Sequence, residues 1–184
     1  MHKKQNHIYV GLDLHKDTHT AVIIDCWEEK LGSITIENKP SDFTQLMNKV
    51  NKIAGDLVPV YGLEDVHGYG RSLAVFLIER GMIVKEVNSA LSYMERMSYP
   101  TTQKSDDWDA RCIASLLLRK LDTLPDANPQ DLYWTIKMMV NRRNSIVKSI
   151  TNLTNQLHEN LNYNYPSYKK FFSDVNGKTA LAFY

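Results

Sequence analysis

Cysteine, glycine and proline are all scarce in this chain, which has 2, 8 and 6 of them among 184 residues. Cys26 and Cys112 stand far apart and lack metal-ligand spacing, so we expect two reduced thiols rather than a disulfide framework or a zinc site. No apolar run reaches the length that a membrane span needs, and no signal-peptide core follows the basic N-terminus. We therefore expect a cytoplasmic protein without a membrane anchor.

A large excess of either charge is also missing, because 22 Lys and Arg residues nearly balance 21 Asp and Glu residues. The net charge of +1 gives no global sign of nucleic-acid binding, so any such binding must come from local patches. Hydrophobic residues make up 43% of the chain, which is ordinary for a globular protein. The length favours one domain with an appendage.

Two aspartates, Asp106 and Asp109, stand at the start of a predicted helix in the segment KSDDWDARCIA, residues 104–114. Ser105 is a favourable N-cap, and acidic residues suit the first helical turn. Residues three apart share a helix face, so both carboxylates fall on the inward side together with Ile113. These residues alone leave two explanations open: helix capping, or a bound metal ion that offsets the cost of burying charge.

Two further acids lie in short apolar runs, Asp13 within residues 9–14 and Glu64 at the end of residues 60–64. Such runs are typical of buried strands, where an acid is rare unless it binds something. Four carboxylates could thus converge, and their hard oxygen atoms suit Mg²⁺ or Mn²⁺. Two such ions support in-line attack on a phosphodiester. We predict a catalytic metal site made of these residues: Asp13, Glu64, Asp106 and Asp109.

The pattern of elements predicts an α/β fold with a mixed sheet and flanking helices. Three antiparallel strands are expected first, then a helix, a strand, a helix, a strand and the acidic helix. The five strands are predicted at residues 8–14, 18–25, 31–37, 58–64 and 82–87. Alternation of strands and helices after residue 40 implies parallel strands with right-handed crossovers. This order suits an RNase H-type sheet, and residues 95–104 are predicted to be a polar loop before the acidic helix.

A long helix is predicted in the C-terminal part, because residues 131–161 contain no glycine or proline. Residues 125–129 are expected to be a linker between a catalytic domain, 1–124, and a helical extension, 130–184. The helix has an apolar heptad rhythm, which favours a coiled-coil-like element and self-association into a dimer or tetramer. The heptad positions are Leu132, Ile136, Met139, Ile146, Ile150, Leu153 and Leu157.

Acidic residues are absent between Asp131 and Glu159, which leaves the basic residues of the long helix unopposed. These groups could contact nucleic-acid phosphates. The alternative is an amphipathic helix that packs on the domain or on its own copy. The predicted nucleic-acid-binding residues are Lys104, Lys137, Arg142, Arg143 and Lys148.

The chain resembles the DEDD transposases of bacterial insertion sequences, the group that includes Piv-type DNA invertases. The resemblance rests on YVGLDLHKDTHTAVIID at 9–25, GLEDVHGYGRSLAVFLIERGMIVKEVN at 62–88 and KSDDWDARCIA at 104–114. Arg142–Arg143–Asn144 and Tyr165–Pro166 also match. Ser105 departs from the usual Thr, and residues 65–67 lack the usual Thr-containing turn, but neither departure touches the four acids.

This resemblance implies a RuvC-like, RNase H-type domain that holds a divalent metal ion on Asp13, Glu64, Asp106 and Asp109. It implies recombination of DNA directed by a structured bridge RNA, with a nucleophilic serine in a C-terminal domain beyond Tyr184. A fragment ending there is expected to bind metal and nucleic acid without completing strand exchange.

Other functions remain open. A RuvC-like nuclease would use water as the nucleophile, although DEDD exonucleases usually carry Asp-x-Glu where this chain has Asp13–Leu14–His15. An actin-like or sugar-kinase-like ATPase would need a second phosphate-binding hairpin, which the sequence does not offer. A non-catalytic RNA-binding oligomerisation module is the third alternative. His15 and His67 could touch a scissile phosphate or simply hydrogen-bond at the rim of the site.

Overall fold

The structure is a computed structural model that describes residues 3–65, 67–100, 105–130 and 132–183. Two compact units make up the chain, Met1–Thr135 and Ile136–Tyr184. A short 3₁₀ helix, Lys3–Asn6, precedes the first strand. None of the helices in the described ranges combines the length and the apolarity that crossing a membrane requires.

A mixed five-stranded sheet forms the centre of the first unit. Its strands are β1 (His7–Leu14), β2 (Thr18–Ile24), β3 (Lys30–Glu37), β4 (Val58–Glu64) and β5 (Ile83–Glu86). They lie in the order β3-β2-β1-β4-β5. β1, β2 and β3 are antiparallel neighbours, whereas β4 pairs parallel with both β1 and β5. The predicted α/β, RNase H-like sheet with three antiparallel opening strands is confirmed.

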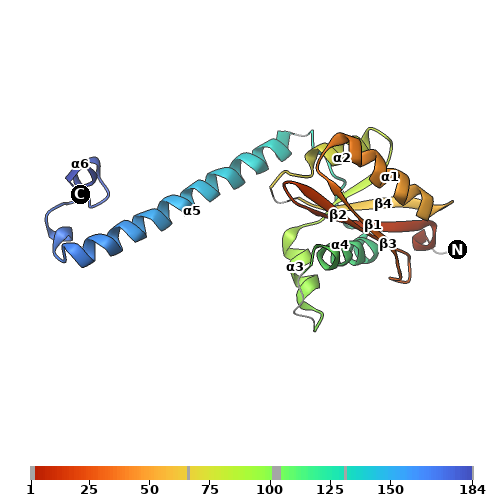
Figure 1. Cartoon of the computed structure of the whole chain (residues 1–184), viewed down its shortest axis with the longest axis horizontal. Helices are drawn as coiled ribbons and strands as arrows, with labels where there is room; N and C mark the ends of the chain where they lie inside the picture. The colour runs from red at the N-terminus through yellow and green to blue at the C-terminus, as the bar shows by residue number, and fades with distance from the viewer. Residues whose placement is uncertain (1–2, 66, 101–104, 131, 184) are drawn as a thin grey trace. The chain divides into compact units, whose positions relative to one another are not determined.

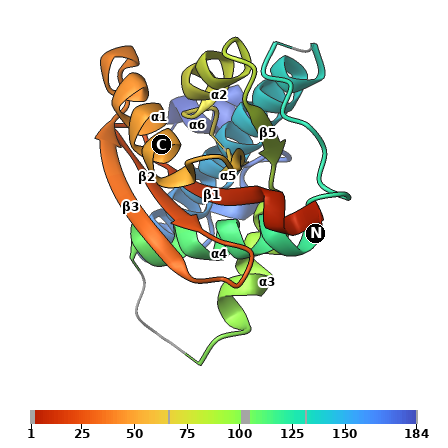
Figure 2. The same ribbon diagram turned by 90° about the vertical axis from the view of Figure 1, so that its right-hand side faces the viewer.

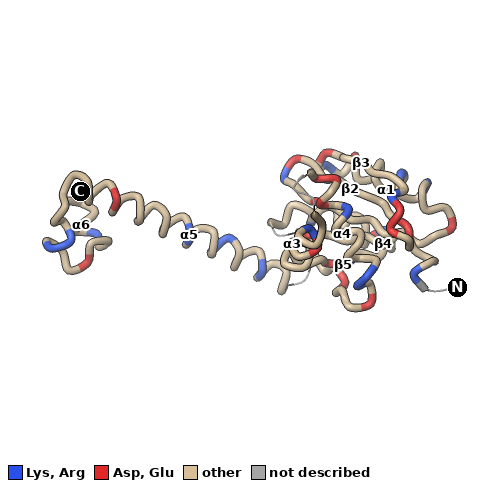
Figure 3. Tube along the Cα trace, turned by 90° about the horizontal axis from the view of Figure 1, so that it is seen from below, with Lys and Arg blue, Asp and Glu red and all other residues tan. Residues whose placement is uncertain are grey.

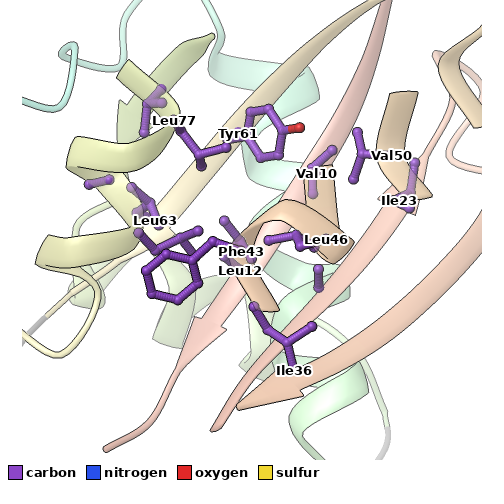
Figure 4. Close-up of a cluster of buried hydrophobic side chains, with 14 of the residues drawn as sticks. Val10, Leu12, Ile23, Ile36, Phe43, Leu46, Val50, Tyr61, Leu63 and Leu77 are labelled. Atoms are coloured by element: carbon purple, nitrogen blue, oxygen red, sulfur yellow. The ribbon is translucent and has the colours of Figure 1, made fainter. Parts of the chain in front are cut away.

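Helices α1 (Pro40–Ala54) and α2 (Arg71–Ile78) cover one face of this sheet, as Figures 1 and 2 show. Side chains alternate between the faces of a strand, so Val10 and Leu12 of β1 point to this side and meet Phe43 and Leu46 of α1. Figure 4 shows this core with Leu77 of α2. Burial of each such side chain stabilises the fold by about 1.5–3 kcal/mol.

Helix α4 (Asp106–Lys120) packs on the opposite face. Ser105 caps its N-terminus, because the Ser105 hydroxyl accepts a hydrogen bond of 3.2 Å from the Trp108 backbone nitrogen. The helix lies so close to β1 that a Cβ atom on Gly11 would collide with backbone atoms of Ala110 and Ala114. Glycine at position 11 therefore sets the distance between the N-terminal half of α4 and the centre of the sheet.

Two segments differ from the sequence prediction. A further helix, α3 (Ser89–Met97), lies between β5 and α4, and its last turn occupies the start of the predicted loop. Residues 125–129 are more than a linker, because they run along β5. The Glu86 nitrogen donates to the Pro125 oxygen at 2.9 Å, and the Ala127 nitrogen donates to the Val84 oxygen at 2.9 Å.

Helix α5 (Leu132–Asn164) is the predicted long helix, and its 33 residues correspond to a length of about 50 Å. Most of its heptad side chains are exposed, as the 65% exposure of Leu153 illustrates. A 3₁₀ helix, Tyr168–Lys170, and a helix α6, Lys178–Phe183, follow. Leu161, Tyr168 and Ala180 form the buried part of the second unit.

Candidate metal centre at the ends of strands β1 and β4

Asp13 and Glu64 are direct neighbours in the parallel ladder of β1 and β4. Both stand at the carboxyl end of their strand, and parallel neighbouring strands lie about 4.8 Å apart. Both side chains also share the face that α4 covers, because the ladder pair two positions earlier, Gly11 and Gly62, packs against α4. Two strands that are far apart in the sequence thus bring two carboxylates together.

The N-terminus of α4 carries the other two predicted ligands. Asp109 is buried, with 6% of its surface exposed, and it precedes Ala110, the residue that packs on Gly11. Asp106 differs from the prediction of an inward-facing side chain, since its side chain remains 57% exposed. It is the first residue of the helix, so its side chain lies at the open edge of the site.

His15 joins two of the acids, from the turn that follows β1. Its Nε2 atom lies 3.1 Å from Asp13 Oδ2 and 3.5 Å from Asp106 Oδ1. One ligand atom from each of these three residues lies within 4.8 Å of the other two. The sequence alone left the role of His15 open, and the structure places its ring between a strand acid and a helix acid.

Arg96 of α3 joins the other two acids, and the sequence gave no sign of it. Its Nη1 atom lies 3.5 Å from Glu64 Oε2, and its Nε atom lies 3.7 Å from Asp109 Oδ1. The four predicted acids therefore fall into two pairs. Asp13 and Asp106 lie around His15, whereas Glu64 and Asp109 lie around Arg96.

The pKa of Asp13 links this strand acid to the helix acids. Burial raises the pKa of the Asp13 carboxyl, and the nearby carboxylates of Asp109 and Asp106 raise it further, while His15 opposes the shift. Among the described residues, Asp109 Oδ1 is buried and accepts no hydrogen bond. A buried carboxylate oxygen without a donor is costly unless a cation binds it.

This donor set fits a hard divalent cation such as Mg²⁺ or Mn²⁺, which prefers carboxylate oxygen ligands. The carboxylates of Asp109 and Asp106 both raise the pKa of Asp13, and Glu64 lies beside Asp13 in the sheet. A bound cation would offset the negative charge that these carboxylates bring together.

Other polar residues nearby have structural partners instead. Asp107 binds Lys30 of β3, with Nζ–Oδ distances of 2.7 and 2.8 Å. The Asp65 carboxylate accepts hydrogen bonds from the Gly68 and Gly70 backbone nitrogens at 2.6 and 3.1 Å, which orders the turn before α2. The ring of His67 lies 5.5 Å from that of Tyr69.

The predicted nucleic-acid-binding residues of the second unit all lie exposed on α5: Lys137, Arg142, Arg143 and Lys148. Figure 3 shows the blue positions along this helix and red only toward its C-terminal end, where Glu159 lies. Lys104 lies outside the described residues.

Comparison with known proteins places this geometry in a family context. Residues 10–166 match the sequence profile of the IS110-type DEDD family, described as transposase. A protein of insertion element IS116 from Streptomyces clavuligerus, described as an uncharacterized 44.8 kDa protein, is 27% identical over 173 residues, which are 94% of this chain. The chain spans 42% of the length of that relative.

Among solved structures, RuvC of T. thermophilus in complex with a Holliday junction substrate is similar to this chain, with a TM-score of 0.47. The sequence identity is 11%, and the match covers 66% of this chain and 99% of RuvC.

Proposed function

The chain belongs to the IS110-type DEDD transposase family, and from that premise we propose that its first unit is the metal-dependent catalytic domain of a DNA recombinase. In this proposal Asp13, Glu64, Asp106 and Asp109 hold Mg²⁺ or Mn²⁺ beside the phosphodiester that is cut and rejoined.

One observation carries the proposal most directly: the acids of two adjacent strands lie in register under the helix that bears the other two. Asp13 pairs with Glu64 in the ladder, and the pKa of Asp13 responds to both Asp106 and Asp109. A capping role alone explains acids at the start of α4, but it does not explain Asp13 and Glu64 in the sheet.

In this proposal, different residues of the chain have different roles. The four carboxylates bind the cation, and His15 hydrogen-bonds Asp13 and so fixes the direction of that carboxylate. A divalent cation bound there would polarise the phosphate and help to position the attacking group. The basic residues of α5 would contact nucleic-acid phosphates.

One finer part of the proposal comes from the heptad positions of α5, which join copies into a dimer or tetramer. Two others come from the family resemblance: a structured bridge RNA directs the choice of DNA, and the nucleophile is a serine outside this chain. These belong to the activity of a longer protein, in keeping with the 42% of the IS116 relative that this chain spans.

Hydrolysis of DNA by the same site is a second candidate, which the placement of His15 favours. A histidine hydrogen-bonded to Asp13 and 3.5 Å from Asp106 is suited to accept a proton from water. Mg²⁺-dependent cleavage of branched or linear DNA by this chain alone would favour hydrolysis. Metal binding without cleavage would favour the recombinase that needs a separate nucleophile.

The metal site is tested by thermal unfolding in EDTA and in millimolar Mg²⁺ or Mn²⁺. A cation that binds only the folded state increases the free energy of unfolding by about 2.7 kcal/mol when its concentration is 100 times its Kd. The melting temperature rises as a result. Wild type and the control D107N should respond, because Asp107 binds Lys30 instead. D109N should lose most of the response. A wild-type protein that responds to neither metal would remove the main physical support for this function.

A further inference from the structure

The guanidinium of Arg96 occupies the space between two of the proposed metal ligands. It lies 3.5 Å from Glu64 Oε2 and 3.7 Å from Asp109 Oδ1, and all three side chains are largely buried, with 25%, 13% and 8% exposed. Two carboxylates so close together repel each other unless a positive charge lies between them. Arg96 supplies that charge from α3.

A separate ion pair holds α3 in place. Glu95, the residue before Arg96, is buried and accepts two hydrogen bonds from Arg119 of α4, at 3.1 and 2.8 Å. Such a two-point contact between a guanidinium and a carboxylate is among the stronger polar contacts in proteins. Arg119 also donates to the Tyr99 hydroxyl and to Glu28. α3 therefore stays attached to α4 whether or not Arg96 holds the acids.

The contacts of Arg96 are long in comparison with those of Arg119. A strong charge-assisted hydrogen bond has a donor–acceptor distance of about 2.7–2.9 Å. Asp109 Oδ1, the atom nearest to Arg96 Nε, accepts no hydrogen bond from the described residues. Arg96 thus neutralises the carboxylates without saturating their oxygen atoms, which leaves the contact open to replacement.

We propose that Arg96 is a built-in counter-cation: it holds Glu64 and Asp109 together in the metal-free protein and leaves them when a divalent cation binds the same oxygen atoms. The inference rests on the proposed function, since it takes both carboxylates as metal ligands. Arg96 is a positioning residue in this account. Arg96 prevents Glu64 and Asp109 from pairing with other groups, and a metal ion must compete with it for the carboxylate oxygen atoms.

The competition is tested by titrating Mn²⁺ into wild type and R96Q and measuring Kd by calorimetry. Because R96Q removes the competing charge, its Kd for Mn²⁺ should fall by about fivefold or more, which corresponds to roughly 1 kcal/mol. R80Q is the matched control. It removes an arginine whose guanidinium hydrogen-bonds the Phe76 oxygen and lies over the Phe76 ring, so its Kd should equal that of wild type.

Stability in EDTA gives a second readout that does not depend on metal. R96Q should melt at a lower temperature than wild type, because the two acids then repel each other without a counter-charge. The double variant R96Q with D109N should recover most of this loss, since one of the repelling charges is gone. If Arg96 only packed against its neighbours, D109N would not restore the melting temperature.

The outcomes separate this inference from the proposed function. The inference is supported if R96Q binds Mn²⁺ more tightly than wild type and the double variant recovers the melting temperature. It is also supported if R96Q binds Mn²⁺ and wild type does not. Wild type that binds Mn²⁺ while R96Q binds no tighter overturns the inference and leaves the metal site intact. Absence of Mn²⁺ binding in both proteins overturns the metal site and the inference together.

Discussion

At the scale of single residues, the candidate site consists of carboxylates close enough for one to change the pKa of another. Asp13 shows this most clearly, because burial and the carboxylates of Asp109 and Asp106 raise its pKa. In the metal-free protein, folding therefore disfavours the ionised form of Asp13 unless a cation compensates.

Replacement of Asp13 by Asn should reveal this effect. The pKa of Asp13 in the folded protein lies above its ordinary value of 3.8, so the acid favours folding below that value and loses this contribution as pH rises through the raised pKa. In EDTA at pH 7, D13N should be as stable as wild type or more stable, and the difference should shrink toward pH 4. Urea unfolding at several pH values measures it. A D13N protein that is much less stable than wild type in EDTA would contradict this effect.

His19 predicts the opposite pH dependence. This residue of β2 is fully buried, its ring lies 6.2 Å from that of Phe43, and burial lowers the pKa of the imidazole. The unfolded chain binds a proton below pH 6.5 and the folded protein resists it, so stability should fall by up to about 1.4 kcal/mol per pH unit below that point. H19Q should show a flatter dependence between pH 7 and pH 5, while H67Q at an exposed position should match wild type.

At the scale of elements, the contact of α4 with β1 places the helix acids over the strand acids. G11A should destabilise the first unit by about 1–3 kcal/mol, because the added methyl group meets backbone rather than a side chain that can rotate away. It should also weaken Mn²⁺ binding, since α4 must shift away from β1. G32A is the control, where the methyl group meets only the end of the Ile53 side chain at 3.0 Å. Equal stability of both variants would show that α4 adapts freely.

Hydrophobic periodicity predicted the strands and the helices α1, α2 and α4, which bury regular apolar faces. It also predicted α5, from an apolar stripe that stays largely exposed in this chain. It missed α3, whose nine residues begin at an Asn88 cap and are anchored by the Glu95–Arg119 pair. A short helix held by a partner 24 residues away leaves little local signal. Arg96 was missed for the same reason. Asp13 and Glu64 could be singled out as candidates, because a charge within an apolar strand is conspicuous in the sequence itself.

The apolar stripe of α5 belongs to the same scale and predicts self-association. Ile150 and Leu153 are 57% and 65% exposed, although they occupy heptad positions that suit burial against a second helix. Replacing both with Asp should give a monomer in light scattering and leave Mn²⁺ binding unchanged. The control places the same charges at Ser149 and Asn152, outside the stripe, and should not alter the mass. A wild-type chain that is already monomeric at high micromolar concentration would rule this interface out.

At the scale of the whole molecule, the total charge is nearly balanced, but the balance of acidic and basic residues differs between regions. The net charge is only +1, yet the proposed metal ligands gather acids in the first unit and α5 offers bases in the second. A chain of this kind can bind a cation and a polyanion at the same time, provided that each charge patch acts locally. The proposed contact with nucleic acid therefore depends on the local group of bases on α5 and not on the overall composition.

Binding of a duplex-containing RNA should therefore depend steeply on salt, because each phosphate contact releases counterions. Changing Arg142 and Lys148 to Glu should weaken binding at low salt and make the slope of log Kd against log salt shallower by about 1.5–2, as expected for two lost contacts. Changing Lys52 and Lys120 of the first unit to Glu reverses the same charge outside α5 and should alter the slope far less. Arg143 is a poorer probe, since it interrupts the heptad stripe. If the α5 variant and the control have the same slope, the bases of α5 serve solubility or packing, and nucleic acid must bind elsewhere on the chain.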